Sequence, residues 1–131
     1  MWIKNSDRLA RTPEREKVLE IINAAFDAID TEHIIQKEIK VENGVLSIKG
    51  HDFNLDNFDR IYIMALGKGA ARAAMSFHSI LGKYITHAIV LDKVPLVYDG
   101  IEAYQGTHPI PSRINVHASS RIYELAESLG E

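Results

Sequence analysis

Residues 59–75 read DRIYIMALGKGAARAAM, from Asp59 to Met75. The segment from Asp59 to Leu66 is apolar almost without alternation, which is typical of a strand covered on both faces of a parallel sheet. Gly67-Lys68-Gly69 ends that run, and the alanines that follow recur at helical spacing. A strand, a glycine turn and a helix are therefore expected in succession, as at the beginning of a βαβ unit.

The pattern continues toward the C-terminus. The helix after the glycine turn is expected to end at Gly82, and its apolar stripe is Ala70, Ala73, Ala74, Phe77 and Leu81. Short β-branched runs predict strands over 87–91 and 101–104, and a final helix is expected from Ser112 to Leu129, closed by Gly130. The residues of this last helix that can face the sheet are Val116, Ser119, Ile122, Tyr123, Ala126 and Leu129. We predict a Rossmann-like α/β fold, with three layers (α/β/α), a mostly parallel sheet and two crossover helices.

Upstream of the strand, Thr12-Pro13 is a helix start, because Thr can cap the first turn and Pro suits its first position. The apolar residues of this helix are expected to pack on one face; they are Val18, Leu19, Ile22, Ala25, Phe26 and Ile29. Between Glu38 and Lys49, Asn43-Gly44 predicts a small β-hairpin, and the polar segment 50–57 is expected to be a loop. The whole chain, residues 1–131, is expected to form a single α/β domain.

Composition narrows the range of functions. The chain has 131 residues, with 15 Lys and Arg against 18 Asp and Glu, and a net charge of −3. This balance gives no basic surface for nucleic acid, and no apolar run approaches the ~20 residues of a membrane helix. Because the chain has no cysteine, disulfides and thiolate chemistry are excluded, and a cytoplasmic protein is the simplest expectation.

The glycine turn is the first candidate site, since ligands of open α/β sheets bind at the carboxyl ends of strands and at helix N-termini. Gly67 and Gly69 would let backbone N–H groups approach an anion, and Lys68 adds a full positive charge. Arg72, one turn into the helix, is a further candidate for binding the same anion. The standard nucleotide motifs are absent, because Arg72 stands where the dinucleotide fingerprint needs its third glycine and no P-loop pattern occurs.

The second candidate site is Gly106-Thr107-His108-Pro109-Ile110-Pro111, between the last predicted strand and the last helix. This segment is expected on the same sheet edge as the glycine turn. His108 could donate a hydrogen bond to a substrate carboxylate or act as a general acid or base. The other histidines, which are His33, His51, His78, His87 and His117, show no metal-ligand spacing, so no metal site is assigned to this chain.

At these two segments the sequence resembles the glycerate 2-kinase family, which is often mislabelled hydroxypyruvate reductase and whose C-terminal portion is called the MOFRL domain. The resemblance is carried by IMALGKGAARAAM over 63–75, followed at about the family's distance by GTHPIP over 106–111. It covers nearly the whole chain. It implies that the chain is the N-terminal portion of a longer kinase, that the MOFRL domain is absent, and that the isolated chain is inactive.

The resemblance further implies phosphorylation of D-glycerate to 2-phosphoglycerate with ATP and Mg²⁺, which the absent portion would largely bind. Lys68 takes the place of the family's active-site lysine. Substrate contacts are then expected from Gly67, Gly69 and Arg72 and from Thr107, His108 and Pro109. The family commonly has alanine where this chain has Gly69, and aspartate where it has Ser112. Serine can cap a helix as aspartate does, but any direct role of that aspartate is lost.

Two other functions remain open from the residues alone. One is a non-catalytic anion-binding or interaction module that uses the same glycine turn. The other is a nicotinamide-binding domain, for which Asp92 would be the acidic residue after the second strand. Whether the chain forms a homodimer also remains open.

Overall fold

A parallel sheet forms the centre of the computed structural model, which describes residues 2–129. Its strands are β4 (Tyr62–Leu66), β5 (His87–Asp92) and β6 (Glu102–Gln105), in the order β4-β5-β6. The central strand is the buried one, with Ala88, Ile89 and Val90 at most 1% exposed. The expectation of a first strand covered on both faces was therefore wrong, because β4 lies at an edge of this sheet, its first four residues are only partly buried and Leu66 is exposed.

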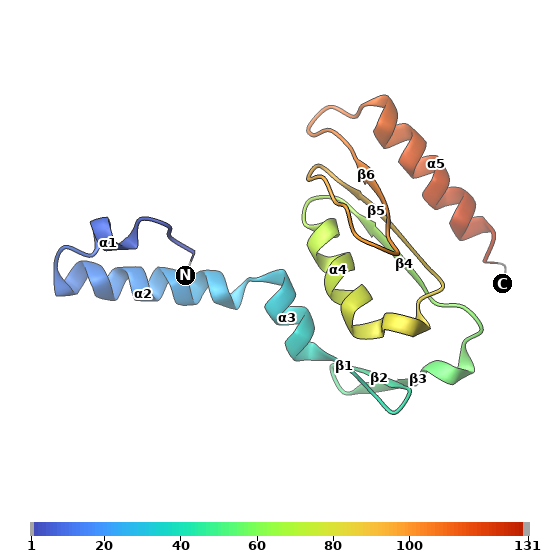
Figure 1. Ribbon diagram of the computed structural model, residues 1–131, viewed down its shortest axis with the longest axis horizontal. Coiled ribbons are helices and arrows are strands. Elements are labelled where there is room, and N and C mark those ends of the chain that lie inside the picture. Colours follow the sequence, from blue (N-terminus) through green and yellow to red (C-terminus); the bar gives the residue numbers. More distant parts are fainter. Residues whose placement is uncertain (1, 130–131) are drawn as a thin grey trace.

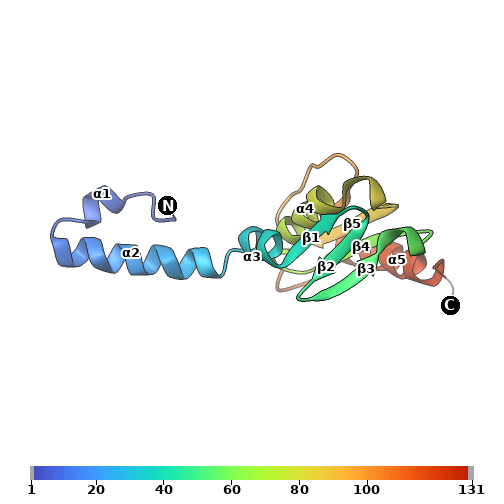
Figure 2. The same ribbon diagram turned by 90° about the horizontal axis from the view of Figure 1, so that it is seen from below.

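Helices cover the two faces of this sheet, as Figures 1 and 2 show. Helix α4 (Ala70–Leu81) lies on one face and α5 (Arg113–Glu127) on the other, which confirms the predicted three-layer α/β/α arrangement. The first turns of α4 pack their alanines against Val90, and Ile63, Ala65, Leu96 and Ile101 surround this core. Because alanine side chains are short, α4 can approach the sheet closely. Gly82 ends α4, as predicted.

The connections differ from the prediction in one respect. Only α4 crosses between strands of the sheet, since β5 is joined to β6 by a segment without a helix, and α5 follows β6. The predicted inner face of α5 is confirmed at Ile122 but not at Val116 and Tyr123. Ala118 and Ile122 are its buried residues, whereas Val116 and Tyr123 are 65% and 64% exposed. The reason is that α5 lies over β5 and β6 and leaves the β4 side of that face uncovered. The predicted stop at Gly130 lies outside the described residues.

The first two helices extend away from the sheet (Figure 2). Helix α2 (Pro13–Ala28) begins after Thr12, whose side chain accepts a hydrogen bond from the Arg15 N–H, as the sequence predicted. The expectation of a packed apolar face was wrong for the described residues, because α2 has no buried residue. It is covered in part by α1 (Ser6–Leu9) and by Trp2, whose ring lies 6.0 Å from that of Phe26.

A second, antiparallel sheet follows α3 (Thr31–Glu38). It consists of β1 (Ile39–Glu42), β2 (Val45–Ile48) and β3 (His51–Asn54), in that order. The predicted hairpin is confirmed, and positive φ values at Asn43 and Gly44 make its turn. The expectation of a loop over 50–57 was wrong, because β3 pairs with β2 there. All four residues of β3 are exposed, so the segment lacks the apolar alternation by which a strand is recognised. Short 3-10 turns lie at Leu55–Asn57 and Gly82–Tyr84.

A polar network around Glu102 ties α5 to the start of the parallel strands. Glu102 pairs with His87 on β5 at 2.8 Å and accepts a hydrogen bond from the Tyr104 hydroxyl. Arg121 on α5 approaches the same carboxylate at 3.5 Å. The Tyr104 hydrogen bond, against the opposing effect of burial, lowers the pKa of Glu102 below its ordinary 4.5, and His87 and Arg121 lower it further.

We expect Glu102→Gln to destabilise the chain by about 1–2 kcal/mol at neutral pH, the cost of weakening hydrogen bonds to a charged group. Because the folded-state pKa is lowered, the stabilisation by Glu102 is fully present above pH 4.5 and is lost as the pH falls through the folded value. Urea unfolding of the native chain and of Glu102→Gln, at neutral and at acid pH, measures the difference in their free energies of unfolding. The difference between them should shrink in acid, and a difference that stays constant with pH would contradict the prediction.

Candidate functional site

Three segments meet at the carboxyl edge of the parallel sheet. The glycine turn, 67–69, follows β4, Asp92 ends β5, and the segment 106–111 follows β6. Parallel strands end at the same edge, and β5 lies between the other two. The first and last segments are therefore separated by two strand spacings, about 10 Å. The structure thus brings the two segments predicted as candidate sites to one edge, with Asp92 between them.

Two backbone N–H groups of the glycine turn, those of Gly67 and Gly69, donate hydrogen bonds within the protein. Gly67 and Gly69 have φ values of 102° and 88°, a region that side chains rarely adopt. The Gly67 N–H donates to the Leu91 carbonyl at 2.9 Å, and the Ala70 N–H donates to the Gly67 carbonyl at 3.1 Å. Lys68 is exposed, as are the two glycines beside it, so the turn presents a positively charged side chain to solvent.

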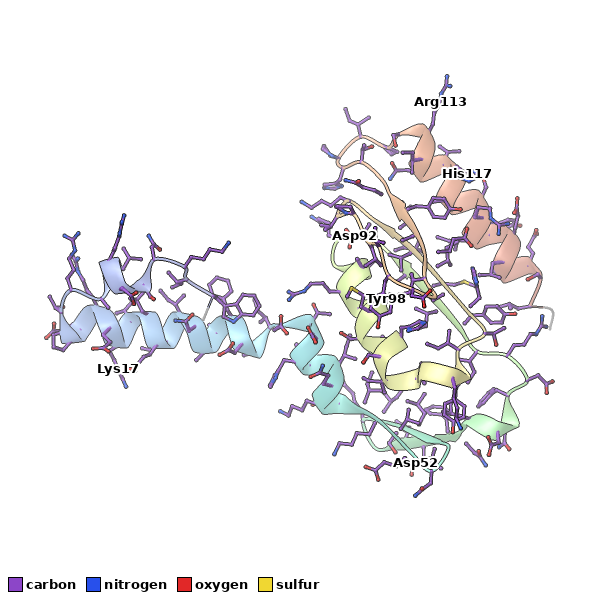
Figure 3. The ribbon with its side chains drawn as sticks, in the orientation of Figure 1. Lys17, Asp52, Asp92, Tyr98, Arg113 and His117 are labelled. Carbon is purple, nitrogen blue, oxygen red and sulfur yellow. The ribbon has the colours of Figure 1, made fainter. Side chains whose placement is uncertain are left out.

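Asp92 occupies the N-terminus of α4 (Figure 3). Its Oδ2 accepts hydrogen bonds from the N–H groups of Gly69 and Ala71, at 3.1 and 3.0 Å. Its Oδ1 accepts from the Val94 N–H at 3.3 Å, and the residue is 3% exposed. Burial by itself raises the pKa of this carboxyl, but backbone N–H donors, of which Ala71 contributes most, hold the pKa below its usual value.

This arrangement was missed in the sequence, where Asp92 stood only as a candidate for binding a nicotinamide cofactor. That function would need its carboxylate to reach a ribose hydroxyl. Both carboxylate oxygens instead accept hydrogen bonds from the backbone of this chain. The sequence did contain a signal for this role of Asp92, which is an acidic residue at the end of the strand that follows the glycine turn and its helix. Parallel register places the end of β5 beside the start of α4.

Arg72 is engaged away from the segment 106–111. Its Nη1 lies 3.2 Å from Oδ2 of Asp30, the residue that caps α3, and its guanidinium stacks 6.0 Å from the ring centre of Trp2. It also lines a cavity of about 300 Å³ with residues of α3 and with Tyr98. Arg72 therefore connects α4 to the N-terminal helices in this structure.

Asn115 organises the segment after β6. Its Oδ1 accepts hydrogen bonds from the N–H groups of Thr107 and Ser112, both at 2.9 Å, and its Nδ2 donates to the Thr107 carbonyl at 3.3 Å. Gly106 lies directly beneath, where an added Cβ would come within 2.5 Å of Asn115 Nδ2 and 2.9 Å of Leu91 Cδ1. Asn115 was not singled out in the sequence, since one asparagine on a helix gives no signal of its loop contacts.

Thr107, His108 and Pro109 are exposed at the edge of the sheet. The Thr107 hydroxyl donates to the Ile110 carbonyl at 2.6 Å, and the peptide bond between His108 and Pro109 is cis. Beside this segment, a groove of about 820 Å³ runs along α5. Its lining includes Leu91, Pro111, Asn115, Val116, Ser119 and Tyr123.

Among residues 2–129, no group of three or more His, Cys, Asp or Glu side chains is arranged to hold a metal ion. No helix in the same range combines the length and the apolar character needed to cross a membrane.

Comparisons with known proteins identify relatives. A family model described as "Domain of unknown function (DUF4147)" matches residues 17–131. A D-glycerate 2-kinase from Thermotoga maritima is 34% identical over 80 residues, which are 57% of this chain and 19% of the relative. A glycerate 2-kinase from Picrophilus torridus is 25% identical over 132 residues, covering 98% of this chain and 29% of that protein. The chain thus spans less than a third of the length of either curated relative.

Two solved structures share the fold. The PH0495 protein from Pyrococcus horikoshii OT3 superposes with a TM-score of 0.74 at 22% identity, over 87% of this chain and 26% of the other. A glycerate kinase from Thermotoga maritima superposes with a TM-score of 0.64 at 25% identity, over 86% of this chain and 25% of that chain. The chain therefore belongs to the DUF4147 domain family, and its predicted resemblance to the N-terminal portion of a glycerate 2-kinase is confirmed.

Proposed function

We propose that this chain is the lysine-bearing portion of an ATP-dependent kinase that phosphorylates D-glycerate to 2-phosphoglycerate. The observation that carries the proposal is the exposed Lys68, placed between two glycines with positive φ at the carboxyl edge of the sheet, in a chain similar to two curated glycerate 2-kinases. Phosphoryl transfer depends mainly on positioning and on electrostatic stabilisation. An ammonium group at this edge suits that chemistry.

In this proposal, Lys68 binds either the transferring phosphoryl group or the substrate carboxylate. His108, about two strand spacings away, donates a hydrogen bond to the substrate or exchanges a proton with its hydroxyl. Gly67 and Gly69 shape the turn, and Thr107 and Pro109 shape the opposite border of the substrate site. Arg72 contributes only if its guanidinium leaves Asp30, with which it pairs at 3.2 Å.

Nucleotide and Mg²⁺ are proposed to be bound outside this chain. The described residues offer no cluster that fits a metal ion, and the curated relatives are much longer than the segment they share with this chain. When bound, Mg²⁺ would neutralise charge on the transferring phosphate. No step assigned here to residues of this chain passes through the ion.

The test is an ADP-release assay with ATP, Mg²⁺ and D-glycerate, performed on the full-length gene product and on the 131-residue chain alone. We expect D-glycerate-dependent ADP release from the full-length protein and none from the chain alone. Phosphorus NMR of the product should show 2-phosphoglycerate and not 3-phosphoglycerate. A full-length protein that releases ADP equally with and without D-glycerate would refute the kinase proposal.

A further inference from the structure

The start of α4 has the geometry of an anion site, but it is already filled by the protein itself. Its N–H groups carry the partial positive charge of a helix N-terminus, which commonly binds phosphate after a glycine turn. Here the Gly69 and Ala71 N–H groups both donate to Oδ2 of Asp92. A phosphate would have to displace a carboxylate that is 3% exposed.

The same carboxylate also joins two strand ends. Asp92 is the last residue of β5, and its hydrogen bonds hold the turn that follows the neighbouring strand β4. The Gly67 N–H reinforces this connection by donating to the Leu91 carbonyl at 2.9 Å. Lys68 lies between these two attachments, so the direction in which its side chain leaves the turn depends on them.

We propose that Asp92 is a positioning residue with two effects. It closes the N-terminus of α4 to external phosphate, and it fixes the glycine turn so that the anion is bound by the Lys68 side chain instead of by the backbone. The part that concerns catalysis rests on the proposed kinase function. The part that concerns phosphate does not.

The first test follows the backbone amides of the 131-residue chain by ¹H–¹⁵N NMR during titration with inorganic phosphate. In the native chain, the Gly69 and Ala71 amides should not respond. In Asp92→Ala these N–H groups lose their acceptor, and their signals should shift saturably as phosphate binds. A residue with only a structural role would not produce this gain of binding. Equal phosphate responses of these amides in the two proteins would overturn the proposal.

A second variant covers the case in which Asp92→Ala does not fold. Asp92→Val suits a strand position and removes both acceptor oxygens, and we expect it to show the same phosphate response. If Asp92→Val is folded and its Gly69 and Ala71 amides behave as in the native chain, the proposal is wrong. Asp52→Asn, on the exposed strand β3, is the matched control and should leave both amides unchanged.

The third test measures kcat for D-glycerate phosphorylation in the full-length gene product. Misplacing a catalytic group by about 1 Å can cost ~10²-fold, so we expect a loss of that order in Asp92→Ala, with Asp52→Asn unaffected. An unchanged kcat in Asp92→Ala would show that Asp92 does not position Lys68. If the native protein proves not to phosphorylate glycerate, the kinase proposal fails, whereas the phosphate titration still decides whether Asp92 closes the helix N-terminus.

Discussion

Replacing Lys68 by methionine should lower kcat for D-glycerate phosphorylation by about 10³-fold, the effect of removing one preorganised electrostatic group from a transition state. Methionine keeps the length and most of the apolar stem of lysine but has no charge. Because the side chain of Lys68 is exposed and makes no contact that stabilises the core, the free energy of unfolding should change by less than about 0.5 kcal/mol.

The measurement pairs the ADP-release assay with urea unfolding of the same preparations of full-length protein. Lys40→Met is the matched control, since Lys40 is exposed on β1, in the other sheet, and its loss should leave kcat unchanged. Lys68→Arg keeps the charge but not its position, and an intermediate rate is expected. A near-normal kcat in Lys68→Met would show that this lysine takes no part in the reaction.

The elements around Lys68 were predictable because their signals are local. An unbroken apolar run, glycines that tolerate positive φ and alanines at helical spacing lie next to one another in residues 59–75. Thr12-Pro13 and Asn43-Gly44 are similarly local, and both mark the structures that they predicted. In each case the residues that carry the signal also form the turn or the cap.

The errors concern contacts between distant parts of the chain. The apolar residues of α2 have helical spacing, but spacing does not reveal that the helix points away from the sheet (Figure 1). Strand β3 is held by its pairing with β2, not by an apolar pattern of its own. The identity of the buried strand was also mistaken, because the position of a strand in a sheet depends on the order of strands, which hydrophobicity alone does not determine.

The same distinction applies to the candidate site. Lys68 and His108 were selected as candidates from their glycine and proline neighbours, but the side chains that hold their segments in place were not recognised. Asp92 and Asn115 act over separations of 23 and 8 residues, respectively. Each accepts hydrogen bonds from backbone N–H groups at the edge of the sheet. The bond from Ala71 to Asp92 is buried, and a buried backbone group without a partner is costly. The register of β4 and β5 makes the role of Asp92 evident, whereas the contacts of Asn115 lie within the loop and helix that follow β6.

The second of these residues leads to a strong stability prediction. Asn115→Ala should lower the free energy of unfolding by about 1–2 kcal/mol, because the Thr107 and Ser112 N–H groups lose a shared acceptor and the Thr107 carbonyl loses its donor. Asn115→Asp keeps the acceptor oxygen and loses only the donor, so it should cost about 1 kcal/mol. Urea unfolding of the three proteins gives both values.

Asn115→Ala should also lower kcat, because Asn115 holds the segment that carries His108. With its anchor removed, the segment 107–111 samples other conformations, and kcat of the folded full-length protein should fall while the phosphate response of the Gly69 and Ala71 amides stays as in the native chain. This separation is expected because Asn115 contacts the loop after β6, and Asp92 holds the turn after β4. If Asn115→Ala unfolds at the same urea concentration as the native protein, the hydrogen bonds to Asn115 contribute nothing to the loop, and the placement of His108 requires another explanation.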